Sequence, residues 1–170
     1  MVRVMLGGGE SSVSKQMRKH KEGIEMLRLR NFESAFHYFD SLIDMEPQNA
    51  LAYAMRGRCY LEMGKNENAL IDAAKSISLD NTFSHPYLTK GRALYTMGML
   101  HEAVLEFEKA VWYSRNDPEG YRWRGLVHCR LGYHVHGESD LKKAVELGDE
   151  NAQYMLRRRD DVKIWGNQKL

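Results

Sequence analysis

The sequence predicts an all-α solenoid of antiparallel helix pairs, and two observations support that fold class. Glycines recur at a constant interval of 34 residues, at Gly23, Gly57, Gly91 and Gly125. Within each interval the apolar residues follow helical spacing that is interrupted once, near the middle. One interval therefore corresponds to two helices joined by a short turn. Self-similarity at this period is typical of stacked repeat units rather than of one closed core.

Small residues mark where the two helices of a unit approach each other and where the chain turns. The mid-helix glycines have small counterparts in the second helices, namely Ala35, Ala69, Ala103 and Gly137. Because glycine inside a helix costs roughly 0.5–1 kcal/mol relative to alanine, close packing must favour it there. A second set of glycines is expected to end the first helices, where a left-handed residue satisfies the last carbonyls: Gly64, Gly98 and Gly132.

The period divides most of the chain into four units with a segment on either side. The units span 34 residues each: 16–49, 50–83, 84–117 and 118–151. Residues 1–15 are expected to form a flexible lead-in, and residues 152–170 a capping helix with a tail. A stack of repeats exposes its last apolar face unless a further helix covers it. Tyr154, Met155, Val162 and Trp165 are the apolar residues expected to cover that face.

Three helix starts carry residues that can accept hydrogen bonds from the first turn. Asp117 precedes Pro118, which favours a capping residue followed by proline in the first turn. Ser84, followed closely by a proline, is expected to cap the third unit in the same way. Asn151 is expected to cap the last helix.

The repeated residues have the spacing of a known family. Tyr87, Gly91, Gly98, Ala103 and Phe107 resemble the tetratricopeptide repeat, which has a bulky aromatic, two glycines, an alanine and an aromatic in this order. The resemblance covers about residues 16 to 151 and implies a right-handed superhelix. It also implies a non-enzymatic adaptor, assembly factor or scaffold that binds a segment of another protein in its concave groove.

The resemblance places particular residues of the first helices along that groove. Carried over position by position, they are Lys21, Ile24, Met55, Arg58, Leu88, Arg92, Tyr95, Arg122, Trp123, Leu126 and Arg130. Arginine forks suit carboxylates, and apolar and aromatic surfaces suit hydrophobic anchors, so we predict an acidic, partly hydrophobic peptide as ligand. The alternative is that these arginines stay solvated or pair with Glu62 and Glu119.

One well-known variant of the family is disfavoured by this sequence. Chaperone-binding repeats hold a C-terminal carboxylate with lysine, asparagine and arginine side chains. The corresponding residues here are His20, Ile24, Met55, His85 and Thr89, and none of them matches. A different peptide is therefore expected in the groove.

The charge balance gives little reason to expect a nucleic acid partner. The chain has 25 basic and 23 acidic residues, and its net charge of +2 is too even to indicate one. An RNA or ribonucleoprotein role remains as an alternative, through the basic fourth unit and Arg157, Arg158 and Arg159, with binding that weakens in salt. A self-associating structural module is a further alternative, although we expect a monomer.

The sequence lacks the motifs of an enzyme, a metal site or a cofactor site. No phosphate loop, nucleophile elbow or paired-carboxylate motif is present. His134 and His136 point to different faces of a helix, and His128 stands where a packed core residue is expected. Cys59 and Cys129 lie in helical patterns without a disulfide framework, which favours a reducing, cytoplasmic location. No apolar run approaches the roughly 18–20 residues of a membrane span.

Overall fold

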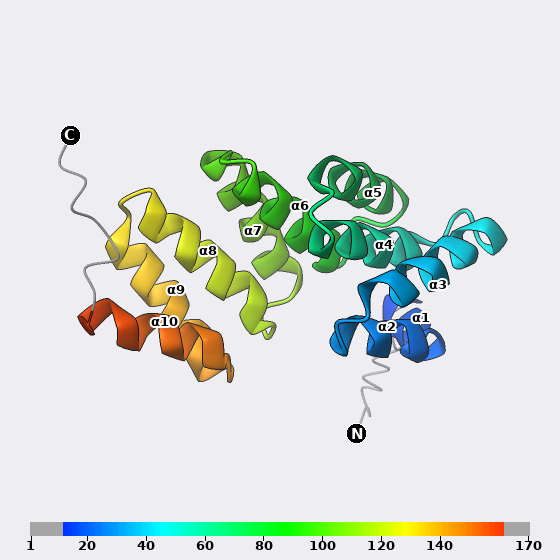
Figure 1. The fold of residues 1–170 in the computed structure, drawn as a ribbon. Helices are drawn as coiled ribbons and strands as arrows, with labels where there is room; N and C mark the ends of the chain where they lie inside the picture. The colour runs from blue at the N-terminus through cyan, green and yellow to red at the C-terminus, as the bar shows by residue number, and fades with distance from the viewer. Residues whose placement is uncertain (1–11, 162–170) are drawn as a thin grey trace, which may run out of the picture.

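The computed structural model describes residues 12–161, and this part of the chain contains ten helices and no strand. Figure 1 shows the helices stacked in chain order, from the blue N-terminal helices to the red C-terminal helix. Their bounds are α1 Ser12–Lys19, α2 Lys21–Arg28, α3 Phe32–Met45, α4 Ala50–Glu62, α5 Asn66–Leu79, α6 His85–Thr96, α7 Leu100–Tyr113, α8 Pro118–Arg130, α9 His134–Glu146 and α10 Glu150–Asp161.

Helices α4, α6 and α8 form an inner layer, and α5, α7 and α9 form an outer one. Each inner helix packs against the outer helix of its own unit, and the inner helices α4, α6 and α8 also pack against one another in sequence. This arrangement is the predicted solenoid of helix pairs. It places the side chains of the first helices on one shared surface.

The first unit differs from the others because its first helix is in two pieces. α1 ends at Lys19 and α2 begins at Lys21, with His20 at φ −105° and ψ 32° between them. Backbone hydrogen bonds still link the two pieces, from His20 N to Gln16 O and from Ile24 N to His20 O. α1 begins inside the segment 1–15 that was expected to be a lead-in, and residues 1–11 lie outside the described residues.

The core follows the repeat, because the same positions supply buried residues in each unit. The small residues of the second helices, Ala35, Ala69 and Ala103, have no exposed surface. Phe39 and Phe107, also fully buried, occupy equivalent positions in the first and third units. Ala152, Met155 and Leu156 of α10 pack with Leu141 and Tyr121, so α10 covers apolar surface of the fourth unit. Val162 and Trp165 of the expected cap lie outside the described residues.

The turns inside the units use left-handed backbone. Gly64, Gly98 and Gly132 have φ values of 76°, 81° and 86°, each just after the end of a first helix. In the first unit Arg30 takes this conformation with φ 60°, although it carries a side chain. A non-glycine residue in this region stores backbone strain, which glycine avoids in the other three units.

Two of the three expected helix caps differ from the structure. Asp117 accepts a hydrogen bond from Glu119 N at 3.0 Å, as its sequence predicts. The expectation for Ser84 was wrong, because its φ and ψ are already helical and its side chain makes no capping bond. The expectation for Asn151 was also wrong. α10 begins one residue earlier, and Asp149 accepts from Ala152 N at 2.9 Å.

An ion pair joins the two helices of units two, three and four at the same place in each. Arg56 pairs with Asp72 at 2.7 Å, Lys90 with Glu106 at 2.9 Å and Arg124 with Asp140 at 2.7 Å. The basic residues are 34 residues apart, as are the acidic ones. The acidic side chains are nearly buried, with 5%, 8% and 10% of their surface exposed. We call these three contacts the ion-pair ladder.

Candidate functional site

The inner layer contains a small pocket where α4, α6 and α8 meet. Its lining residues are Met55, Arg58, His85, Leu88, Thr89, Arg92 and Glu119. The repeat explains this convergence, because His85 and Glu119 occupy one repeat position, and Arg58 and Arg92 another. Four of the residues predicted for the groove, Met55, Arg58, Leu88 and Arg92, therefore line one site.

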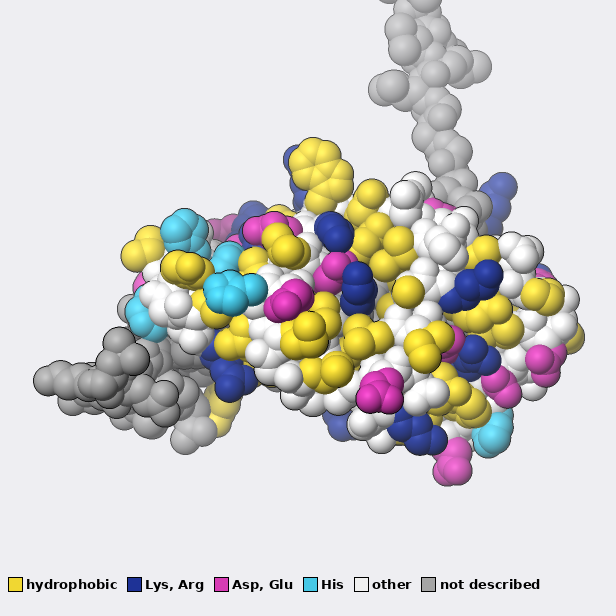
Figure 2. Space-filling view, turned by 90° about the horizontal axis from the view of Figure 1, so that it is seen from above, with side chains coloured by type: hydrophobic (Ala, Val, Ile, Leu, Met, Phe, Trp, Pro, Cys, Tyr) yellow, Lys and Arg dark blue, Asp and Glu magenta, His cyan; other side chains and the backbone are white. Residues whose placement is uncertain are grey.

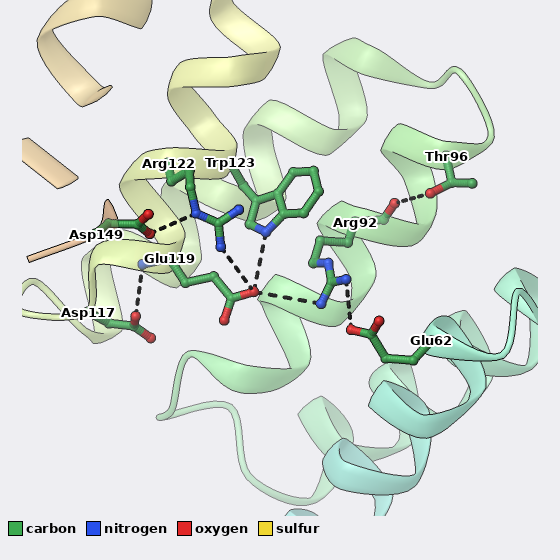
Figure 3. A network of polar contacts seen from close by, with 8 residues as sticks. All are labelled: Glu62, Arg92, Thr96, Asp117, Glu119, Arg122, Trp123 and Asp149. Carbon is green, nitrogen blue, oxygen red and sulfur yellow. Dashed lines mark hydrogen bonds and ion pairs between the residues drawn. The ribbon is translucent and has the colours of Figure 1, made fainter. Parts of the chain in front are cut away.

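Arg92 lies at the centre of a polar network that spans three helices. Its guanidinium pairs with Glu62 of α4 at 2.8 Å and with Glu119 of α8 at 3.6 Å. Figure 3 shows the Arg92 side chain between these two carboxylates. Only 18% of the Arg92 side chain is exposed. The alternative interpretation, in which a groove arginine pairs with Glu62 and Glu119, is therefore what the structure shows for this residue.

Trp123 packs beside this network and is held on several sides. Its ring is nearly parallel to Phe107 at a centroid distance of 6.1 Å and meets the edge of Tyr95 at 5.5 Å. The guanidinium of Arg92 lies 5.1 Å from its ring centre, a favourable cation–π distance. The indole N–H donates to Glu119 at 3.3 Å, as drawn in Figure 3. Trp123 is thus a fixed aromatic wall.

Arg122 is bound to the helix that follows the four units. Its Nε donates to Asp149 at 2.7 Å, and the same carboxylate side chain caps α10. A weaker pairing at 3.8 Å links Arg122 to Glu119. Sequence reasoning missed Asp149, because no periodic signal indicates its partner.

Arg58 differs from the other arginines of this surface. It lies between Met55 and the neighbouring unit and lines the pocket, yet it forms no ion pair with any carboxylate of residues 15–157. It is partly exposed. Arg92 and Arg122 are already neutralised by nearby acids, so Arg58 is the pocket arginine whose charge has no counterpart within this part of the chain.

His85 contributes a second polar group without a partner. Its Nδ1 atom is buried and makes no hydrogen bond, and the same holds for Nε of Arg92. Burial lowers the pKa of His85 below its ordinary value of 6.5, and the nearby Arg58 acts in the same direction. Asp117 and Glu119 oppose that effect. The pocket therefore offers a cation and an unused imidazole nitrogen beside the apolar Met55 and Leu88.

The other predicted groove residues are placed outside this pocket. Lys21 is exposed on α2, and Ile24 packs against the core of the first unit. Tyr95 packs against the core of the third unit, with Arg130 above its ring at 5.0 Å. Leu126 is half-buried on α8. Met55, although it lines the pocket, is almost fully buried, with 2% exposure.

A second hollow lies at the end of the molecule formed by α8 and α9. Figure 2 shows histidine side chains gathered at this end. His128 Nδ1 lies 3.2 Å from Asp140, and its ring lies 5.9 Å from that of His136. No cluster of three or more histidine, cysteine, aspartate or glutamate residues in the described part could hold a metal ion. His128 therefore belongs to the polar contacts around the ion-pair ladder.

Comparison with protein families decides the identity of the repeat. Two family models described as tetratricopeptide repeat match the chain, one over residues 20–80 and the other over residues 84–117. The chain belongs to the tetratricopeptide repeat family. The resemblance predicted from Tyr87, Gly91 and the residues that follow them is confirmed.

Relatives of this tetratricopeptide repeat chain are much larger proteins. The mouse E3 ubiquitin-protein ligase TTC3 is 30% identical over 138 residues, which are 79% of this chain and 7% of that protein. Human DnaJ homolog subfamily C member 3 is 33% identical over 120 residues, or 70% of this chain and 24% of that protein. The wheat (Triticum aestivum) Hsp70-Hsp90 organizing protein is 29% identical and matches 59% of this chain and 17% of its own length.

Solved tetratricopeptide repeat structures have the same fold. A thermophilic protein of Thermus thermophilus superposes with a TM-score of 0.68 at 23% identity, covering 76% of this chain and 72% of its own. The second such domain of human RPAP3, in complex with the HSP70 peptide SGPTIEEVD, has a TM-score of 0.55 at 25% identity. That match covers 63% of this chain and 89% of the RPAP3 domain. The predicted right-handed solenoid is therefore confirmed. Within the described residues, no helix is long and apolar enough to cross a membrane.

Proposed function

We propose that this chain is a non-enzymatic interaction module whose inner surface binds an acidic, partly hydrophobic segment of another protein. The observation that carries the proposal is the pocket at α4, α6 and α8, where the unpaired Arg58 lies beside apolar side chains. A cation that has no internal partner suits a carboxylate of the ligand. Leu88 and the fixed ring of Trp123 suit its hydrophobic residues.

Human RPAP3 supports the chemistry of this proposal. Its domain binds SGPTIEEVD, a peptide that has acidic residues next to isoleucine and valine. The contacts in this chain must differ, because His85 and Thr89 replace the lysine and arginine of the chaperone-binding variant. An adaptor, assembly factor or scaffold is the role we propose for a module of this kind.

We also propose a reducing, cytoplasmic location. Cys59 and Cys129 are both free and buried. Burial raises the pKa of the Cys59 thiol to about 12, so this side chain behaves as a small apolar residue rather than as a nucleophile.

The charge of Arg58 is the feature to test. We expect Arg58→Glu to abolish capture of partner proteins from a native lysate, because a carboxylate at this position repels the acidic ligand. Circular dichroism should show unchanged helicity, since Arg58 forms no ion pair within residues 15–157. Lys75→Glu, on the outer helix α5, is a matched charge reversal that should leave capture intact. Equal recovery by the Arg58→Glu variant and the wild type would refute the groove.

The RNA alternative predicts a different result from the same assay. Capture that disappears after nuclease treatment, and that weakens when Arg157, Arg158 and Arg159 are neutralised, would favour it. Capture that survives nuclease and responds only to Arg58→Glu would favour a peptide ligand.

A further inference from the structure

The outer face of α7 has apolar side chains that the fold leaves uncovered. Leu105 is 55% exposed and Trp112 is 67% exposed. They are seven residues apart, so they lie on the same side of the helix, two turns from each other. Together with Glu108, Lys109 and Tyr113 they line a shallow hollow.

The repeat itself does not require these apolar residues. The positions equivalent to Trp112 in the other units are polar: Asp44, Ser78 and Glu146. The positions equivalent to Leu105 are His37, Ile71 and Ser139. Stacking of the units buries the opposite side of α7, where Ala103 and Phe107 are fully buried. The exposed pair is therefore specific to the third unit, and packing within the chain does not explain it.

The charges on this face are complementary to those of the same face turned around. When two copies of α7 lie antiparallel about an axis between residues 108 and 109, Leu105 lies opposite Trp112 of the second copy. In this register Glu108 lies opposite Lys109, and Glu102 lies opposite Arg115. Each of these contacts occurs twice, as an isologous interface requires. A surface in which apolar residues meet apolar ones and every charge meets its opposite fits a second copy of this chain.

We propose that the outer face of α7 is a self-association surface, on which two copies of the chain pack antiparallel around a twofold axis. Glu108 forms no ion pair with the described residues and is free to accept the partner's Lys109. The Lys109 side chain is 51% exposed and contacts Glu106 at 3.1 Å, so its ammonium retains donors for a second carboxylate. Arg115 covers one face of the Trp112 ring at 4.9 Å and leaves the other available.

The association is expected to be weak, because a single helix pair buries less than the roughly 1,200 Å² of a standard interface. We expect sedimentation equilibrium of the full chain to show a mass that rises from monomer towards dimer between micromolar and millimolar concentration. A constant monomer mass over this range would overturn the proposal. A constant mass together with binding of Trp112 to lipid vesicles would instead assign the face to a membrane surface.

Charge exchange tests the register. Glu108→Lys alone places lysine against Lys109, and Lys109→Glu alone places glutamate against Glu108, so each variant should self-associate at least about tenfold more weakly. An equimolar mixture restores opposite-charge contacts and should recover the dimer. A mixture that stays monomeric, or single variants that still dimerise, would refute this register.

Two further sets of variants keep the result interpretable. If Lys109→Glu alters the circular dichroism spectrum through Glu106, the exchange of Glu102→Lys with Arg115→Glu tests the same axis at its outer contacts. Leu105→Glu should abolish association, whereas Ile71→Glu, at the equivalent and similarly exposed position of α5, should leave it unchanged. Loss of association in both would indicate a non-specific effect and would overturn the proposal. None of these residues lines the pocket of Arg58, so peptide capture and self-association can fail independently.

Discussion

At the residue scale, Gly57 and Gly91 occupy the same repeat position but have different neighbours. A Cβ atom at Gly91 would lie 2.6 Å from the Phe107 ring, whereas one at Gly57 would lie 3.2 Å from Asp72 Cβ. The difference arises because the second unit has Ala73 where the third has Phe107. A large aromatic core residue thus makes glycine a steric requirement in the third unit.

We therefore expect different results from the same substitution at these two positions. Gly91→Ala should lower the free energy of unfolding by about 1–2 kcal/mol, because overpacking against Phe107 exceeds the gain of about 1 kcal/mol in helix propensity. Gly57→Ala should change it by less than about 0.5 kcal/mol, because the two effects nearly cancel. Urea unfolding followed by circular dichroism measures both. Equal changes at the two positions would contradict this explanation.

At the element scale, the ion-pair ladder fixes how each outer helix lies against its inner helix. In the fourth unit the Arg124 guanidinium donates two hydrogen bonds to Asp140, at 2.9 and 2.7 Å. The carboxylate is nearly buried, so its charge depends on this partner for solvation. A planar fork bonded at two points also restricts rotation of one helix against the other.

Removal of one partner should cost more than removal of a surface ion pair. We expect Arg124→Met to lower the free energy of unfolding by about 2–4 kcal/mol, because Asp140 is left with His128 alone. Lys143→Met breaks the exposed pair with Glu146 and should leave the urea midpoint almost unchanged. A double variant, Arg124→Met with Asp140→Leu, should regain much of the loss. Equal midpoints for Arg124→Met and Lys143→Met would show that the ladder does not stabilise the fold.

At the scale of the whole molecule, buried histidines connect stability to pH. Burial lowers the pKa of both His20 and His85 below 6.5, and Lys19 adds to the effect at His20. The unfolded chain therefore takes up protons near pH 6.5 that the folded chain accepts only at lower pH. More protons are bound in the unfolded state across this window, so stability rises with pH.

We expect the free energy of unfolding to be fully retained above about pH 7 and to fall as the pH drops from about 6.5 towards about 5. Urea unfolding at a series of pH values measures this slope. His85→Gln should flatten it, whereas His101→Gln, at an exposed position of α7, should not. An identical slope in wild type and in a His20→Gln, His85→Gln double variant would contradict the assignment.

The period of 34 residues predicted what repeats and missed what does not. Gly64 and Gly98 were identified as turn residues because their spacing is regular, and the structure has left-handed backbone there. The ladder was equally periodic, yet sequence reasoning overlooked it, although Arg56, Lys90 and Arg124 mark it in the sequence. The pairing of Arg92 required three helices in space, and no spacing along the chain indicates which of the two carboxylates is within reach.

The first unit lacks the ladder, and this absence gives the array a direction. Glu22 and Tyr38 occupy the positions where the later units have the ion pair. A hydrogen bond between His20 and Tyr38 at 3.1 Å and an exposed Lys19–Glu46 contact stand in its place. Cohesion in such arrays is a sum over neighbouring units. Heat or a pulling force therefore peels the molecule from α1 onward, and the pocket at α4, α6 and α8 outlasts the loss of the N-terminal helices.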